Sequence, residues 1–438
     1  MTSSTLKSAN IGDWGEMQYR LHLEGIGTDD GPALLKGPAG DVEALCAHGQ
    51  LTDTGRLTTH LLGGRFRHLY VDQLGFMPKD LKNTDMMYLR ATCVPRALES
   101  MQEAFWGMYP VEHRLNPFPN PPIVTRALAD ENLFPNEGNC RRFASLVRAY
   151  AKRTAVRWNT SDDMKFLNDR LGRYMPEASK RVAVDGSPRA SGIMDTVNSV
   201  LAHGPEVHLP PEFSDAKVRA ILDKVCVEEW FAGFKESREY RMLGIGSLMG
   251  DITARMVKSA ELNGHASTTT PAADHTPAPP AQDGSEGIRM TLNGCHDTTL
   301  ASVLASLGAF ENGKWPPYTS HLAIELFRKS NLARSANQPG ILSTATGWIT
   351  SFFEAAVSGS STTEPIGRKR LNKFSTTERA IIDGYYVRIR YNDEVVTIPG
   401  CGVEGSHLEG DKSFCTLVST TPHNSHIVSL TTSSTVRI

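Results

Sequence analysis

The chain has 438 residues, 40% hydrophobic and 21% charged, which is typical of a globular protein of two or three domains or of one large core with an inserted cap. Its 46 Lys and Arg residues nearly balance 48 Asp and Glu residues, which gives a net charge of −2. The chain therefore lacks the excess of positive charge that is typical of proteins that bind nucleic acid. The sequence shows no secretory signal at its start and no apolar stretch that could span a bilayer. Seven cysteines without a Cys-x-x-Cys pair argue against a disulfide scaffold and a zinc ribbon.

In chain order, the first predicted element is a helix over residues 52–69, where leucines recur at helical spacing and Asp53 or Thr54 is available as its cap. Residues 85–91 predict a strand. A helix is predicted over residues 95–107, and the proline in its first turn supports that start.

The stretch 110–262 is predicted to be a helical cap, in which Ser214 and Asp215 precede an amphipathic helix. After it, residues 288–293 predict a second strand, and a tight turn leads into a helix over 298–307.

Three segments near the end alternate apolar and polar residues, at 322–326, 387–391 and 394–398, and predict an antiparallel meander that closes a mixed sheet. Strand–helix alternation interrupted by a helical stretch predicts an α/β core with an inserted α-helical cap.

Two stretches are predicted to be disordered. The linker 263–287 lacks large apolar residues from His265 onward, and the tail 416–438 has 11 Ser and Thr among 23 residues. The predicted domains are a first core segment (11–109), the cap (110–262), the linker (263–287), a second core segment (288–415, with an insertion at 331–373) and the tail (416–438). Cys401 and Cys415 enclose a Gly-rich loop, and their pairing or reduction stays open.

Candidate chemistry lies at the two predicted strand-to-helix turns, where helix N-termini favour anions. Arg90 ends one strand, and His296 and Asp297 follow the other. Arg90 is expected to grip a phosphoryl group through two oxygens, His296 to donate to a third, and Asp297 to protonate the leaving oxygen. The alternative is structural: Arg90 pairs with a surface acid, and His296 and Asp297 cap the helix.

Several segments of the sequence resemble the histidine acid phosphatases (histidine phosphatase superfamily, branch 2), and in particular the branch with lysophosphatidic acid phosphatase and fungal relatives. They are Gly49-Gln50-Leu51-Thr52, Leu89-Arg90-Ala91-Thr92 with Pro95-Arg96-Ala97-Leu98-Glu99-Ser100, Gly294-Cys295-His296-Asp297-Thr298-Thr299, Trp315-Pro316-Pro317-Tyr318, Glu325-Leu326-Phe327 and Pro399-Gly400-Cys401.

The resemblance implies a phosphoglycerate mutase-like core and an acid phosphatase that works through a phosphohistidine without metal or organic cofactor. It implies that Arg90 and His296 bind phosphate and that Asp297 is the proton donor. The implied partner is a small-molecule or lysophospholipid phosphate monoester, and the implied compartment is mitochondrial or cytoplasmic.

The sequence departs from the family at the nucleophile, which the family carries in an Arg-His-Gly motif that does not occur in this chain. His48 precedes a glycine but is expected to be a solvated loop residue. We therefore expect that an N-terminal segment of the parent gene product is missing and that activity is impaired. The alternative is an inactive protein that binds phosphate esters, or a truncated gene product.

Other motifs favour structural interpretations. The glycines of residues 244–250 are expected to permit close helix packing rather than to bind a nucleotide. His60 and His68 are expected at the edge of the core, and Arg141 and Arg142 on an exposed helix face.

Overall fold

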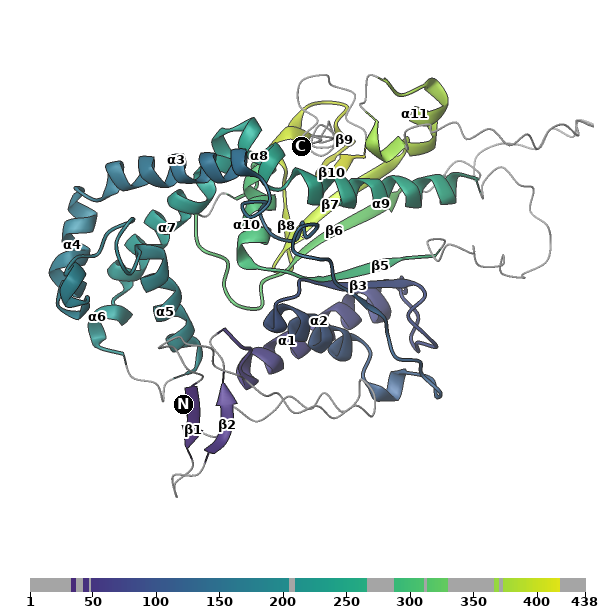
Figure 1. The fold of residues 1–438 in the computed structure, drawn as a ribbon. Helices are drawn as coiled ribbons and strands as arrows, with labels where there is room; N and C mark the ends of the chain where they lie inside the picture. Colours follow the sequence, from purple (N-terminus) through teal and green to yellow (C-terminus); the bar gives the residue numbers. More distant parts are fainter. Residues whose placement is uncertain are drawn as a thin grey trace, which may run out of the picture. The chain divides into compact units, whose positions relative to one another are not determined.

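The structure is a computed structural model that describes residues 33–36, 42–46, 49–204, 209–265, 287–310, 313–329, 366–369 and 373–417 (Figure 1). His48 and most of the predicted linker, insertion and tail lie outside these residues. The chain divides into two compact units, Met1–Leu248 with Ala272–Leu322 and Met249–Pro271 with Ala323–Ile438. The predicted boundaries between core and cap stay predictions.

A three-stranded parallel sheet organises the first unit. Its order is β4 (Ile123–Val124), β3 (Met87–Ala91) and β5 (Met290–Gly294), so the predicted strands β3 and β5 are confirmed as direct neighbours. Ala91 at the end of β3 pairs with Gly294 at the end of β5. The carboxyl ends of both strands therefore lie side by side.

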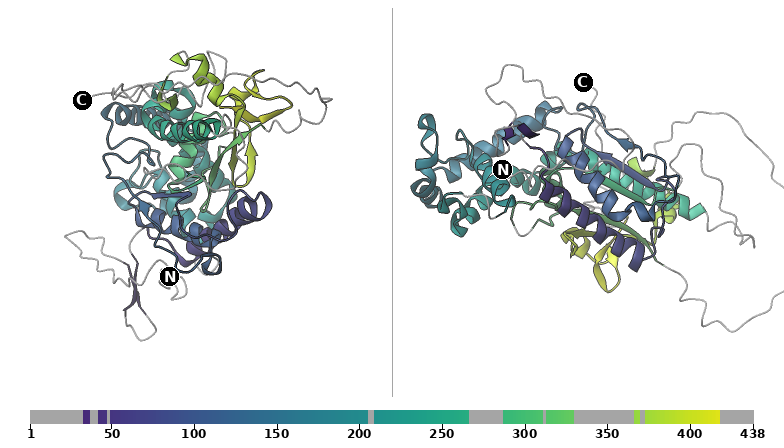
Figure 2. Two further views of the ribbon diagram at one scale, coloured as in Figure 1. Left: turned by 90° about the vertical axis from the view of Figure 1, so that its right-hand side faces the viewer. Right: turned by 90° about the horizontal axis from the view of Figure 1, so that it is seen from below.

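Two helices, α1 (Asp53–Phe66) and α2 (Pro95–Met108), lie side by side in the views of Figure 2. α1 continues as a π-helical segment, Arg67–Gln73. Pro95 stands in the first turn of α2 as predicted. The predicted cap of α1 is corrected: Thr52 has extended backbone, and its hydroxyl accepts the Gly55 N–H at 3.1 Å.

The helical region that follows has α7 at its centre. Its helices are α3 (Arg141–Trp158), α4 (Asp162–Leu171), α5 (Ala190–Ala202), α6 (Pro211–Ser214), α7 (Ala216–Glu236) and α8 (Arg238–Gly244). Helix α9 (Gly246–His265) follows in the chain, and most of it belongs to the second unit. Short 3₁₀ turns span Val111–His113, Gly172–Tyr174 and Glu177–Ser179. Asp215 caps α7 as predicted, accepting the N–H groups of Lys217 and Val218 at 2.8 and 3.1 Å. A Cβ on Gly244 would lie 2.6 Å from the Phe143 ring, which confirms close packing at this glycine.

The second unit contains an antiparallel sheet of β6 (Leu322–Arg328), β7 (Tyr385–Tyr391), β10 (Asp411–Thr416) and β9 (His407–Leu408), with β8 (Glu394–Val396) on β7. Helix α11 (Thr376–Ile382) and 3₁₀ turns at Ile366–Arg368 and Pro399–Gly402 complete it. Asn392 and Asp393 have positive φ angles of 49° and 69°, which a tight hairpin requires. Cys401 and Cys415 form a disulfide, which decides between the two open alternatives.

The α/β class and the antiparallel meander are confirmed. The prediction of one mixed sheet differs from the described strands, because the antiparallel strands pair among themselves and β3 to β5 form a separate parallel sheet. A further strand pair consists of β1 (Ala33–Lys36) and β2 (Val42–Cys46). Within the described residues, we find no helix with the length and hydropathy of a membrane span.

Close contact between β5 and α2 gives a prediction. A Cβ on Gly294 would lie 2.2 Å from the Ala97 carbonyl oxygen, so Gly294→Ala should overpack this contact and lower the free energy of unfolding by about 1–3 kcal/mol. Gly64→Ala is the control, since its Cβ would meet no atom within 4 Å and alanine favours a helix interior by about 1 kcal/mol. Urea unfolding measures the free energy of unfolding of both variants, and equal changes in the two would contradict the close contact at Gly294.

Candidate active site

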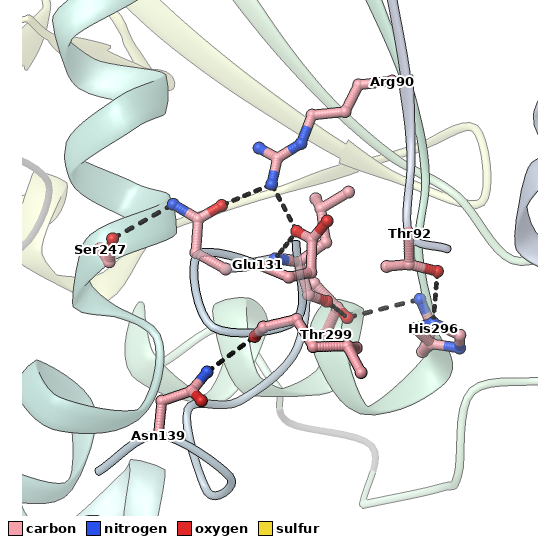
Figure 3. A network of polar contacts seen from close by, with 10 residues as sticks. Arg90, Thr92, Glu131, Asn139, Ser247, His296 and Thr299 are labelled. Atoms are coloured by element: carbon pink, nitrogen blue, oxygen red, sulfur yellow. Dashed lines mark hydrogen bonds and ion pairs between the residues drawn. The ribbon is translucent and has the colours of Figure 1, made fainter. Parts of the chain in front are cut away.

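The candidate site lies where β3 and β5 end and α2 and α10 (Asp297–Ser306) begin. Thr92 follows β3, and its Oγ1 lies 3.0 Å from Nε2 of His296, the N-cap residue of α10 (Figure 3). The predicted meeting of the two turns is thus observed. Both helix N-termini contribute partial positive charge at the same edge of the sheet.

The guanidinium of Arg90 is held by other side chains. Its side chain is 3% exposed, forms an ion pair with Glu131 and donates from Nη2 to Asn132 Oδ1 at 2.8 Å (Figure 3). The guanidinium therefore has a buried acid as its partner and almost no exposed surface for a ligand. This placement gives no support to the phosphate contact expected of Arg90. It agrees with the structural alternative, except that the acid is buried and not on the surface.

The buried ion pair anchors a loop that packs on His296. Glu131 accepts the Leu133 N–H at 2.7 Å, the Leu133 carbonyl accepts the Thr299 hydroxyl, and Thr299 Oγ1 accepts the His296 N–H at 3.4 Å. The Phe134 ring then stacks on the imidazole, with centroids 4.5 Å apart and planes at 14°. The loop thereby fixes the orientation of His296.

The electrostatics of His296 bring a second arginine into the site. Burial lowers the pKa of His296 to about 4, and the charge of Arg96 adds to this, whereas Asp297 and Glu131 oppose it. Arg96 lies exposed in the first turn of α2, and its Nη1 donates to the Gly49 carbonyl at 3.3 Å. Sequence reasoning missed Arg96 although it stands in the same motif as Arg90.

The Asp297 carboxylate is held at both oxygens. Oδ1 accepts the Thr298 N–H at 2.7 Å, and Oδ2 accepts the indole N–H of Trp315 at 2.6 Å. Asp297 is exposed in the first turn of α10, so its carboxyl group is oriented yet accessible.

Two further side chains lie within electrostatic reach of Asp297, and sequence reasoning missed both. Burial raises the pKa of Asp195 on α5, and the charge of Asp297 adds to it. Burial also raises the pKa of Tyr318 to about 12, with smaller contributions from Asp195 and Asp297. Tyr318 stands in a recognisable Trp-Pro-Pro-Tyr segment. No local pattern in the sequence indicates that Asp195 on α5 lies near Asp297.

The surroundings of Cys295, His60 and Arg142 do not indicate a catalytic role for these side chains. Burial raises the pKa of the Cys295 thiol to about 12, which keeps this neighbour of His296 un-ionised and poorly nucleophilic. Nδ1 of His60 lies 3.5 Å from a carboxylate oxygen of Glu103, and Arg142 forms an exposed ion pair with Glu239. Among the residues that the structure describes, no group of three or more His, Cys, Asp or Glu is arranged to hold a metal ion.

Comparisons with known proteins identify the family of the chain. The sequence pattern described as histidine phosphatase superfamily (branch 2) matches residues 41–338. A probable acid phosphatase of Schizosaccharomyces pombe is 36% identical over 374 residues, which cover 85% of this chain and 73% of the relative. The human lysophosphatidic acid phosphatase type 6 is 26% identical over 285 residues, 64% of this chain and 57% of the relative.

The chain therefore belongs to the histidine phosphatase superfamily (branch 2), as its motifs predicted. Among solved structures, Hafnia alvei phytase in complex with tartrate aligns over 87% of both chains with 14% identity and a TM-score of 0.47. That score is low, so the assignment depends on the sequence matches.

The structural role of Arg90 gives a prediction. Arg90→Met should lower the free energy of unfolding by about 3–5 kcal/mol, because it leaves the buried Glu131 carboxylate without its partner. Arg142→Met removes an ion pair with Glu239 that is exposed to solvent, so it should change the free energy of unfolding very little. Urea unfolding compares the two variants. A loss for Arg90→Met no larger than that for Arg142→Met would refute the anchoring role.

The low pKa of His296 predicts a pH effect with a definite sign. Between the ordinary value of 6.5 and about 4, the unfolded chain binds a proton at this imidazole that the folded chain does not. His296 should therefore reduce stability as the pH falls through this window. Unfolding at pH 7, 6, 5 and 4.5 should show a shallower decline for His296→Asn than for the parent chain. Parallel curves would mean that His296 titrates normally.

Proposed function

We propose that the chain is an acid-phosphatase-type hydrolase of phosphate monoesters. The observation that supports this most is the grouping of Arg96, His296 and Asp297 at two helix N-termini on adjacent strand ends. The names of the relatives, probable acid phosphatase and lysophosphatidic acid phosphatase, point to the same reaction class.

Phosphate binding is proposed for Arg96 and His296. A guanidinium binds two phosphoryl oxygens bidentately, and Arg96 is exposed at the N-terminus of α2, where the helix dipole also favours an anion. A bound phosphate dianion would in turn favour the protonated form of the nearby imidazole, because an opposite charge stabilises it. We therefore propose Arg96, in place of Arg90, for the phosphate contact that the motif suggested.

Proton donation is proposed for Asp297. When the phosphorus–oxygen bond of an ester breaks, the leaving oxygen takes up negative charge, and a positioned carboxylic acid can supply a proton to it. Asp297 has an accessible carboxyl group at the same helix N-terminus as His296, which suits this role. Asp195 is the second carboxyl group near this position and is the alternative donor.

A second candidate function is binding of phosphate esters without turnover. It is favoured by one observation: the family uses a histidine nucleophile in an Arg-His-Gly motif, and this motif does not occur in the sequence. A lysophospholipid phosphate is the lipid ester that we propose as a substrate or ligand, because the human relative is named for lysophosphatidic acid.

The compartment is also a matter of proposal. Disulfides persist in oxidising compartments and are rare where thiols are kept reduced. The Cys401–Cys415 disulfide therefore favours an oxidising compartment over the cytoplasm.

Leaving-group dependence tests the proposed roles. Asp297→Asn should lower kcat/KM for an alkyl phosphate by about 10²- to 10⁴-fold and affect p-nitrophenyl phosphate much less, because p-nitrophenolate leaves with little help. Arg96→Ala should lower kcat/KM for both esters alike, by about 10- to 100-fold, since a charged contact to the shared phosphoryl group is lost. Equal losses for both esters in Asp297→Asn would remove the acid role, and selective loss in Asp195→Asn would transfer it.

Calorimetry with inorganic phosphate separates the two candidate functions. Binding that Arg96→Ala weakens, together with turnover, supports the hydrolase. The same binding without turnover of either ester supports the second candidate. If the chain neither binds phosphate nor turns over either ester, the proposed site is wrong.

A further inference from the structure

We propose that Trp315 is a positioning residue that orients the Asp297 carboxylate and links it to helix α7. The proposal rests on the proposed function, in which Asp297 is the proton donor. It assigns a role to the tryptophan of the Trp-Pro-Pro-Tyr segment. This tryptophan has no part in the phosphate binding or the proton donation proposed above.

The contact between the two side chains is direct. The indole Nε1 of Trp315 donates to Oδ2 of Asp297 at 2.6 Å, across 18 residues of sequence. The other oxygen, Oδ1, is held by the N–H of the next residue, Thr298, which moves with Asp297 itself. A local contact of that kind leaves the carboxyl plane free to turn with the first turn of α10. Trp315 supplies the second fixed point, from outside the helix.

The indole ring is itself held by α7. Trp230 meets it edge-on, with centroids 5.8 Å apart and planes at 86°, and Phe231 lies at 5.1 Å with planes at 46°. Trp315 also packs against the apolar cluster formed by α3, α4, α5 and α7. The orientation of Asp297 therefore depends on helices of the region predicted as a cap, which contribute no residue to the turn that carries it.

The chemistry of an indole suits this position. Its N–H can only donate, so it cannot take the proton that Asp297 must deliver. Once the proton has passed to the leaving oxygen, the carboxylate is left with a full negative charge, and a charge-assisted hydrogen bond from Trp315 stabilises that product. Loss of the N–H should reduce turnover where protonation limits the rate and leave phosphate binding unchanged.

The contact can be tested without turnover, by following the tryptophan indole N–H signals in ¹H–¹⁵N NMR spectra. Trp315→Phe identifies the signal of Trp315 by its disappearance. Asp297→Ala and Trp230→Ala should both shift this signal, since one removes the acceptor and the other removes the ring that supports the donor. Trp230→Phe keeps a ring in place and should leave the signal close to its parent position. An unmoved signal in Asp297→Ala would overturn the hydrogen bond, and an unmoved signal in Trp230→Ala would overturn the link to α7.

Kinetics test the positioning role. Trp315→Phe should lower kcat for an alkyl phosphate about 10-fold, as expected for loss of one hydrogen bond to a charged group, with KM and p-nitrophenyl phosphate turnover little changed. Trp230→Phe makes the same chemical change on the neighbouring ring and should preserve the parent ratio of the two esters. Equal losses on both esters in Trp315→Phe, or a raised KM for both, would reduce Trp315 to a packing residue. If the parent chain turns over neither ester, the hydrolase proposal and the positioning role fail together, and the NMR spectra still decide the contact.

Discussion

The buried ion pair between Arg90 and Glu131 is the interaction on which the site depends. A buried guanidinium requires an acid partner, and here the pair joins the central strand β3 to the loop that packs on His296. The loop continues through Leu133 to Thr299 in the first turn of α10. One arginine at the end of β3 thus anchors the loop beside His296, and a second, Arg96, six residues later, is exposed at the N-terminus of α2.

Local sequence patterns were sufficient for the elements that form the site. The segments 85–91 and 288–293 predicted β3 and β5, and Pro95 predicted the start of α2, because its fixed φ suits a first helical turn. The convergence of the two strand ends followed from strand–helix alternation, since consecutive parallel strands with crossover helices present their carboxyl ends at one edge. The motif order identified the family, which the sequence comparisons confirm.

The direction of individual side chains could not be predicted in the same way. Arg90 and Arg96 belong to one motif, and the acid that pairs with the buried arginine, Glu131, lies 41 residues beyond Arg90. Asp195 and Trp315 likewise reach Asp297 from other helices and loops. Such contacts depend on tertiary packing, which periodicity along one segment does not encode. For the same reason, the sequence did not predict that the antiparallel strands pair with one another and that β3, β4 and β5 form a separate sheet.

The division of labour between the two arginines is the central claim, and a crystal structure with bound tungstate, a mimic of phosphate, tests it most directly. The account predicts an oxyanion in contact with Arg96 and His296 at the N-termini of α2 and α10, with Arg90 still paired to Glu131. An oxyanion bound to Arg90, with Glu131 displaced, would contradict it.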